Sequence, residues 1–137
     1  MMPPADPRHD QRRALGQAAE DFAARWLTSR GYELIERNYR RRWGEADIIV
    51  RDPDQDVTVI VEVRSRRDTR RGVDALLSVG HRKQRQLLRI AHGMLSESAV
   101  EFDLRIDVLV VGGDPERGFR VLAHVVNALE DAELEDE

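Results

Sequence analysis

Residues 46–63 read ADIIVRDPDQDVTVIVEV and contain two runs of β-branched residues separated by a polar segment. Such runs are typical of strands, and Asp-Pro-Asp at 52–54 is typical of a turn. The stretch therefore predicts a β-hairpin. If the hairpin turns symmetrically about residues 54 and 55, Asp47 lies opposite Glu62, and directly opposed side chains point to the same face of a sheet.

Glu62 places an acid inside an otherwise apolar strand. An ionised carboxylate taken out of water destabilises a fold by several kcal/mol, roughly, unless it is paired, protonated or bound to a metal. Because strand side chains alternate between faces, Glu62 shares its face with Ile60 and Arg64, and the four valines of residues 57–63 form the other face. One interpretation is therefore an ion pair between Glu62 and Arg64 at the end of a sheet.

The opposed carboxylates of Asp47 and Glu62 support a second interpretation. Two carboxylates about 5 Å apart repel each other unless a proton or a cation lies between them. Mg²⁺ is commonly held by one or two carboxylates together with water and substrate phosphates. The pair therefore predicts a Mg²⁺ or Mn²⁺ site of the kind that hydrolyses phosphodiesters, where the metal polarises the phosphoryl oxygen and activates water.

The composition indicates one domain in a chain of 137 residues. The absence of cysteine excludes a disulfide framework and any thiolate zinc site, and it fits a reducing compartment. The sequence has no apolar run long enough to cross a membrane and no signal-peptide segment at its start. We therefore expect a cytoplasmic protein that does not bind membranes.

The formal charge of −4 hides an uneven distribution. Six acids lie in the last eight residues, EDAELEDE, and the positive charge comes almost entirely from arginine, with runs at 40–42 and 64–71. Arginine binds phosphate through two parallel hydrogen bonds, so these runs are candidates for a nucleic-acid contact, although dispersed arginine is also an ordinary solvated surface. The tail is interpreted as disordered and solubilising, or as a competitor of nucleic acid for the basic surface.

The pattern along the chain predicts the element order αβββαββ in an α/β fold, a mixed β-sheet flanked by helices. A proline-rich flexible arm is expected at residues 1–10, one domain at 11–127 and the acidic tail at 128–137. The first helix is expected at residues 11–30, with Gly31 after its end, and the second at roughly 78–96, with Ser78 as its N-cap. The buried stripe of the second helix is expected to include Leu87, Ile90 and Leu95.

Several motifs in order carry a family resemblance. LGQAAEDFAARWLTSRGYELIERNYR is followed by WGEADIIV, VIVEVRSRR, KQRQLLRIAHGML, LRIDVLVV and HVVNAL, and the resemblance covers roughly Leu15 to Val126. Together they resemble the YraN-type family of small uncharacterised bacterial proteins, which is similar in fold to the PD-(D/E)xK restriction-endonuclease-like superfamily. The resemblance implies a restriction-endonuclease-like fold and a Mg²⁺- or Mn²⁺-dependent endodeoxyribonuclease site. It also makes nucleic acid, most simply DNA, the expected partner, and a homodimer an expectation by analogy.

The resemblance assigns roles to individual acids. Asp47 and Glu62 become the metal ligands, and Glu20 matches a glutamate that related nucleases place near the metal. From the residues alone, Glu20 is interpreted as an ordinary residue at the boundary of an apolar helix face. Glu45, in GEAD, matches the pattern too, as an outer residue of the site or as a structural one.

Arg64 departs from the superfamily pattern, which has lysine two residues after the second acid. Arginine does not lose its proton, so Arg64 cannot be a general base, although it can contact the scissile phosphate. The metal alone generates the nucleophile, another residue substitutes, or the chain is a catalytically inactive scaffold that binds DNA or docks a partner. Lys83, the single lysine, is a candidate for a relocated catalytic lysine, a phosphate contact or a structural residue.

Two further groups complete the expectations. Asp107 is expected to be structural and to pair with Arg105 or another arginine, and the four histidines show no metal-ligand spacing. The basic residues expected to contact a nucleic-acid backbone are Arg40, Arg41, Arg42, Arg66, Arg67, Arg70, Arg71 and Lys83.

Overall fold

The computed structural model of the chain describes residues 7–66 and 79–129. The elements are α1 (Pro7–Ser29), β1 (Glu33–Arg41), β2 (Gly44–Asp52), β3 (Val57–Arg66), α3 (His81–Glu97), β4 (Leu104–Asp114) and β5 (Gly118–Val125). Their order confirms the predicted αβββαββ sequence of elements. The chain is an α/β protein.

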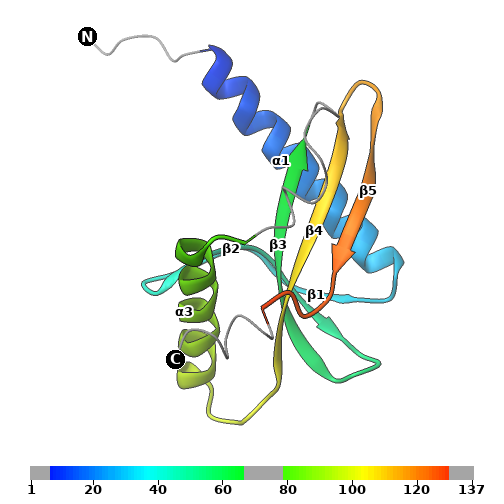
Figure 1. Cartoon of the computed structure of the whole chain (residues 1–137). Helices are drawn as coiled ribbons and strands as arrows, with labels where there is room; N and C mark the ends of the chain where they lie inside the picture. Colours follow the sequence, from blue (N-terminus) through cyan, green and yellow to red (C-terminus); the bar gives the residue numbers. More distant parts are fainter. Residues whose placement is uncertain (1–6, 67–78, 130–137) are drawn as a thin grey trace, which may run out of the picture.

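The strands form one five-stranded mixed sheet in the order β1-β2-β3-β4-β5. Strands β3 and β4 are parallel, and the other neighbours are antiparallel. Helix α1 crosses one face of the sheet and α3 packs on the other (Figure 1). The β2–β3 pairing runs from Ile48↔Val61 to Asp52↔Val57, which confirms the predicted symmetric turn about residues 54 and 55.

Helix α1 begins at Pro7, so residues 7–10 of the predicted flexible arm are helical. Proline is favoured in the first turn of a helix because its missing N–H would have no partner there. Gly31, at φ 95°, follows the helix end as predicted, and the Tyr32 N–H donates to the Leu27 carbonyl across it at 3.1 Å. Residues 1–6 and 130–137, with the rest of the arm and most of the acidic tail, lie outside the described residues.

Helix α3 begins at His81, later than the predicted start at Ser78, which lies outside the described residues. Its N-cap is Gly80, which offers no side-chain hydrogen bond. Leu87 and Ile90 are buried as predicted, but Leu95 is 41% exposed. Leu95 lies in the last turns of α3, where it lines two open hollows.

The two faces of the sheet form two apolar clusters. Val59 and Val61 of β3 pack with Ala23 and Leu27 of α1. Ile60, one position along, packs on the opposite face with α3 residues. The alternation predicted for β3 is confirmed, and it turns Glu62 toward the side of the sheet that α3 covers.

Within residues 7–66 and 79–129, no helix combines the length and apolar character needed to cross a membrane.

Candidate functional site

Strands β2 and β3 separate next to Asp47 and Glu62, and we call this separation the fork. Their mutual pairing ends at Ile48↔Val61; beyond it, the start of β2 pairs only with β1 and the end of β3 only with β4. Asp47 lies at this fork, where its Oδ2 accepts a hydrogen bond from the Val63 backbone N–H at 3.2 Å. A backbone donor that would otherwise lack a partner thus holds the Asp47 carboxylate in place.

Glu20 reaches Asp47 from α1. Alanines at 19, 23 and 24 are buried on the same helix, and such small side chains allow close packing of the helix on the sheet. The half-buried Glu20 carboxyl makes a side-chain hydrogen bond with Asp47. Burial, the Asp47 charge and this hydrogen bond raise the pKa of Glu20 to about 7, so the two carboxylates compete for a proton or a cation.

Glu62 finds its partner on α3. Lys83 Nζ lies 3.3 Å from Glu62 Oε1, and the side chain of Glu62 is only 13% exposed. Burial raises the pKa of Glu62, and so does the Asp47 charge, whereas Lys83 and, more weakly, Arg64 oppose the rise. The acid inside the apolar strand is therefore paired chiefly with a lysine from another element, and Arg64 contributes a smaller attraction.

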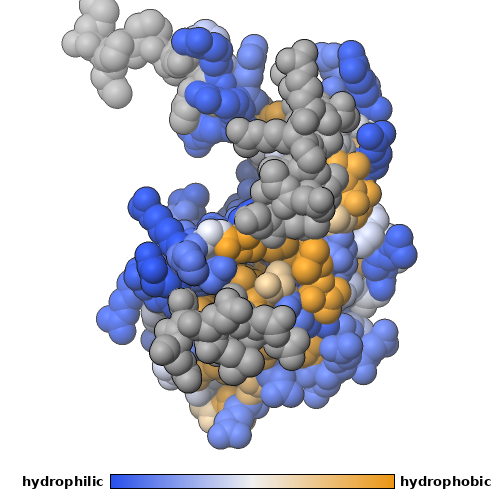
Figure 2. All heavy atoms as spheres, viewed as in Figure 1, coloured by the Kyte–Doolittle hydropathy of each residue, from blue (hydrophilic) through white to orange (hydrophobic). Residues whose placement is uncertain are grey.

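Asp47 interacts with two other acids at the fork, Glu20 and Glu62. Glu20 and Asp47 line a hollow of about 350 Å³ together with Arg13, Arg40 and Glu45. Glu62 is not part of that hollow and lies with Lys83. In the described ranges, no three acidic or histidine side chains form a preassembled metal cluster. Figure 2 shows the surface hollowed between the N-terminal half of α1 and the lobe that contains α3 and the β1–β2 hairpin.

The predicted nucleic-acid contacts on the β1–β2 hairpin are mostly ion-paired within the chain. Arg41 contacts Glu36 at 3.2 Å and lies over the Tyr39 ring at 4.4 Å, and Arg40 lies 3.9 Å from Glu45. Arg42 is exposed. The side chain of Arg66 and the whole of Arg67, Arg70 and Arg71 lie outside the described residues.

A separate charged network centres on Arg105 and Asp107, two buried residues of β4. Arg105 donates to both carboxylate oxygens of Asp107, at 2.9 and 3.0 Å, which confirms the predicted pair, and it also contacts Asp52 at 2.9 Å. His124 lies 2.9 Å from Asp107. Burial raises the pKa of Asp107, but the hydrogen bonds from His124 and Arg105 outweigh it and leave that pKa below its ordinary value.

His124 is a residue that the sequence reasoning missed. It lies on β5, where its ring contacts those of Trp26 and Tyr32. Its position within an apolar strand run, FRVLAHVV, is the signal that indicates burial.

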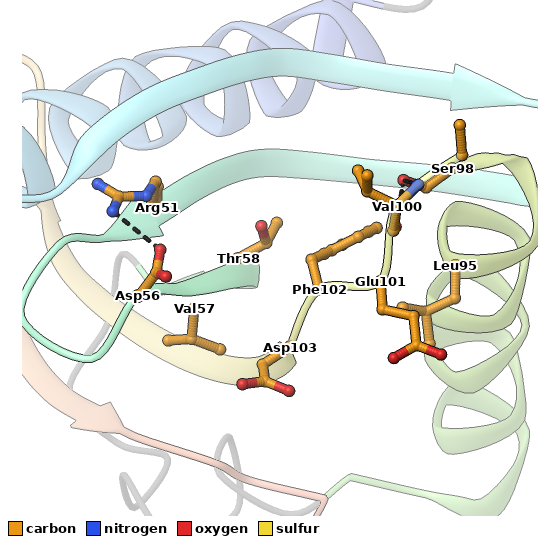
Figure 3. Close-up of a pocket in the computed structure, with 11 residues that line it drawn as sticks. Arg51, Asp56, Val57, Thr58, Leu95, Ser98, Val100, Glu101, Phe102 and Asp103 are labelled. Carbon is orange, nitrogen blue, oxygen red and sulfur yellow. Dashed lines mark hydrogen bonds and ion pairs between the residues drawn. The ribbon is translucent and has the colours of Figure 1, made fainter.

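A further hollow of about 790 Å³ lies between the β2–β3 turn and the C-terminal end of α3 (Figure 3). Arg51 and Asp56 form one wall and are joined at 2.9 Å, and Phe102 lies across from them. This hollow is at the start of β3, the opposite end from the fork. None of the predicted site residues lines it.

Comparison with known proteins places the chain in a family. Residues 19–111 match the model of "Uncharacterised protein family UPF0102". The chain is 41% identical over 129 residues to a "UPF0102 protein" of Treponema pallidum, covering 91% of this chain and 98% of the relative. It is 43% identical over 112 residues to "UPF0102 protein YraN" of Salmonella agona, covering 80% of this chain and 83% of the relative. The chain therefore belongs to the uncharacterised protein family UPF0102.

Proposed function

We propose that this chain binds nucleic acid, DNA in the first instance, through a restriction-endonuclease-like scaffold with a Mg²⁺- or Mn²⁺-dependent phosphodiesterase site. The observation that carries the proposal is the fork itself. Asp47 is held there between Glu20 and Glu62, and its charge raises the pKa of both neighbours. Carboxylates that destabilise one another in this way are stabilised together by a cation.

The donor set fits a hard divalent cation. It offers the carboxylate oxygens of Asp47, Glu62 and Glu20, and the chain has no cysteine to supply a thiolate. Mg²⁺ suits such a site because it keeps several waters and binds one or two carboxylates. Asp47 and Glu62 would hold the metal and Glu20 would support it. Bound there, the metal would supply an activated water and a polarised phosphoryl group.

Two basic residues of the chain have distinct roles in this proposal. Arg64 stays protonated and contacts the scissile phosphate. Lys83 already lies beside Glu62, at 3.3 Å, and its side chain remains 36% exposed. An ammonium in that position can orient the attacking water or the phosphate, which is the part that the strand lysine plays in the superfamily that the sequence resembles.

The test is a cleavage assay with Mn²⁺ on a panel of end-labelled DNAs, comprising duplex, single-stranded, nicked and branched forms. The proposal predicts cleavage of at least one form, its loss in Asp47→Asn, and its retention in Glu101→Gln, an exposed acid away from the fork. Lys83→Ala tests whether Lys83 is catalytic or structural, because unchanged cleavage in this variant excludes Lys83 from the chemistry. Cleavage that survives Asp47→Asn contradicts the site.

A second function is favoured by one observation, the ion pair between Lys83 and Glu62. A carboxylate already neutralised by lysine, next to an arginine that cannot act as a base, suits a scaffold that binds DNA or docks a partner without cutting. DNA binding with no cleavage of any form in the panel, together with no Mn²⁺ binding, would select this function.

A further inference from the structure

Helix α3 carries an arginine face that is distinct from the runs on the hairpin. Arg82, Arg85 and Arg89 recur at spacings of three and four residues, so they line one side of the helix, and all three are exposed. Leu87, Ile90 and Ala91 are buried on the opposite side, against the sheet. We call Arg82, Arg85 and Arg89 the α3 arginine face.

This face is unbalanced in charge. Within the described ranges, none of its three arginines makes an ion pair, and none has an acid three or four residues away along α3. Like charges at these spacings destabilise a helix. Arginines of β1 and β2 are, by contrast, neutralised by Glu36, Glu45 and other acids of the chain.

We infer that the α3 arginine face binds the phosphate backbone of a nucleic acid. The face spans about 10 Å of helix axis, from the rise of 1.5 Å per residue, which is enough for two or three phosphates of one strand. Arg82 neighbours Lys83, so the face begins beside the fork. The inference thus rests on the proposed function and identifies the surface along which the nucleic acid is held.

The chemistry of this face favours nucleic acid over a membrane surface. Gln86, His92 and Ser96 accompany the arginines on the exposed side, with no large apolar side chain among them to enter a bilayer. Figure 2 shows strongly hydrophilic residues along the left margin, where Figure 1 places the N-terminal half of α3 and the β1–β2 hairpin.

The test measures binding of a fluorescent 20-base-pair DNA duplex by anisotropy, in EDTA, from 50 to 200 mM salt. The triple variant Arg82→Gln/Arg85→Gln/Arg89→Gln is compared with a control of equal charge change, Arg25→Gln/Arg117→Gln/Arg120→Gln, on α1, the β4–β5 turn and β5. The α3 variant is expected to bind at least about tenfold more weakly, with the slope of log affinity against log salt reduced by about 3. The control is expected to resemble the unaltered chain.

Three outcomes would overturn the inference. Equal losses of duplex affinity in both variants would show that the attraction depends on total charge and not on the α3 arginine face. The proposed nucleic-acid binding would remain. Absence of duplex binding by the unaltered chain would show that the α3 arginine face does not bind DNA. The metal site at the fork would still be tested separately by Mn²⁺ titration. Unchanged duplex affinity in the α3 variant, with loss of binding to phosphatidylserine vesicles, would assign the face to membranes.

Discussion

The ammonium group of Lys83 lies 3.3 Å from the carboxylate of Glu62, and this contact links α3 to the fork between β2 and β3. Lys83 is the single lysine of the chain, and Glu62 is the one acid in the apolar run VTVIVEV of β3. The pair therefore bears on stability as well as on the proposed chemistry.

Lys83→Met should destabilise the chain at pH 8 by about 1 kcal/mol, because Glu62 is left without its main cation while solvent screens the partly exposed site. The pKa of Glu62 is already raised in the folded state, and it should rise further without Lys83. Protonation of Glu62 removes the unpaired charge, so the loss should shrink at pH 5. Urea denaturation at both pH values measures the effect; Arg82→Met is the control, and equal losses at both pH values would contradict it.

Glu20→Gln should stabilise the chain at pH 8 and have little effect at pH 4. The folded state raises the pKa of Glu20 from 4.5 to about 7. Between these two values the unfolded chain ionises Glu20 more readily than the folded chain, so the folded state loses stability as the pH rises. Glutamine is neutral throughout and avoids this penalty, which should amount to about 1 kcal/mol after screening by solvent. The free energy of unfolding measured from pH 4 to 8 checks it. A constant difference across the range would mean that the two carboxylates do not interact.

Asp107→Asn should destabilise the chain at pH 7 by about 3 to 5 kcal/mol, because Arg105 and His124 lose a fully buried partner. The lowered pKa of Asp107 predicts that its contribution is present above the unfolded pKa of about 3.8 and is lost as the pH falls through the lower folded value. Chemical denaturation is the measurement, with the exposed Asp103→Asn as control. A loss below about 1 kcal/mol would contradict the hydrogen bonds of Asp107 with Arg105 and His124.

Gly93→Ala should destabilise the chain by about 1 to 3 kcal/mol, because a Cβ at position 93 would overlap the indole ring of Trp43, which lies against α3. Gly16→Ala is the matched control, since a Cβ there meets no atom within 4 Å and alanine is the better helix former. This control should raise the melting temperature. Equal behaviour of the two variants would contradict the packing of Trp43 on Gly93.

The hairpin and its register could be predicted because both depend on local sequence. The polar turn at 52–56 separates two β-branched runs, and a shift of one residue would turn every buried side chain of β3 to the wrong face. The position of Asp47 near Glu62 followed directly. Glu20 came from the family resemblance, because its approach to Asp47 depends on the packing of α1 on the sheet.

The partners of the charges could not be predicted in the same way. The sequence offered Arg64 as the neighbour of Glu62, whereas the fold brings Lys83 from another element. The sequence predicts that Arg40 and Arg41 contact phosphate, yet the β1–β2 pairing sets Glu45 opposite Arg40, and Glu36 pairs with Arg41. The α3 arginine face was overlooked because the sequence draws attention to runs of arginine, whereas residues three and four positions apart converge only on a helix.

Titration of Mn²⁺ into the purified chain by calorimetry addresses the central proposal without requiring a known substrate. Asp47→Asn and Glu62→Gln are compared with Glu101→Gln, an exposed acid away from the fork. A metal site at the fork predicts saturable binding that is lost in both fork variants and retained in the control. Saturable binding that survives both substitutions, or no binding by the unaltered chain, would contradict a metal centre formed by Asp47 and Glu62.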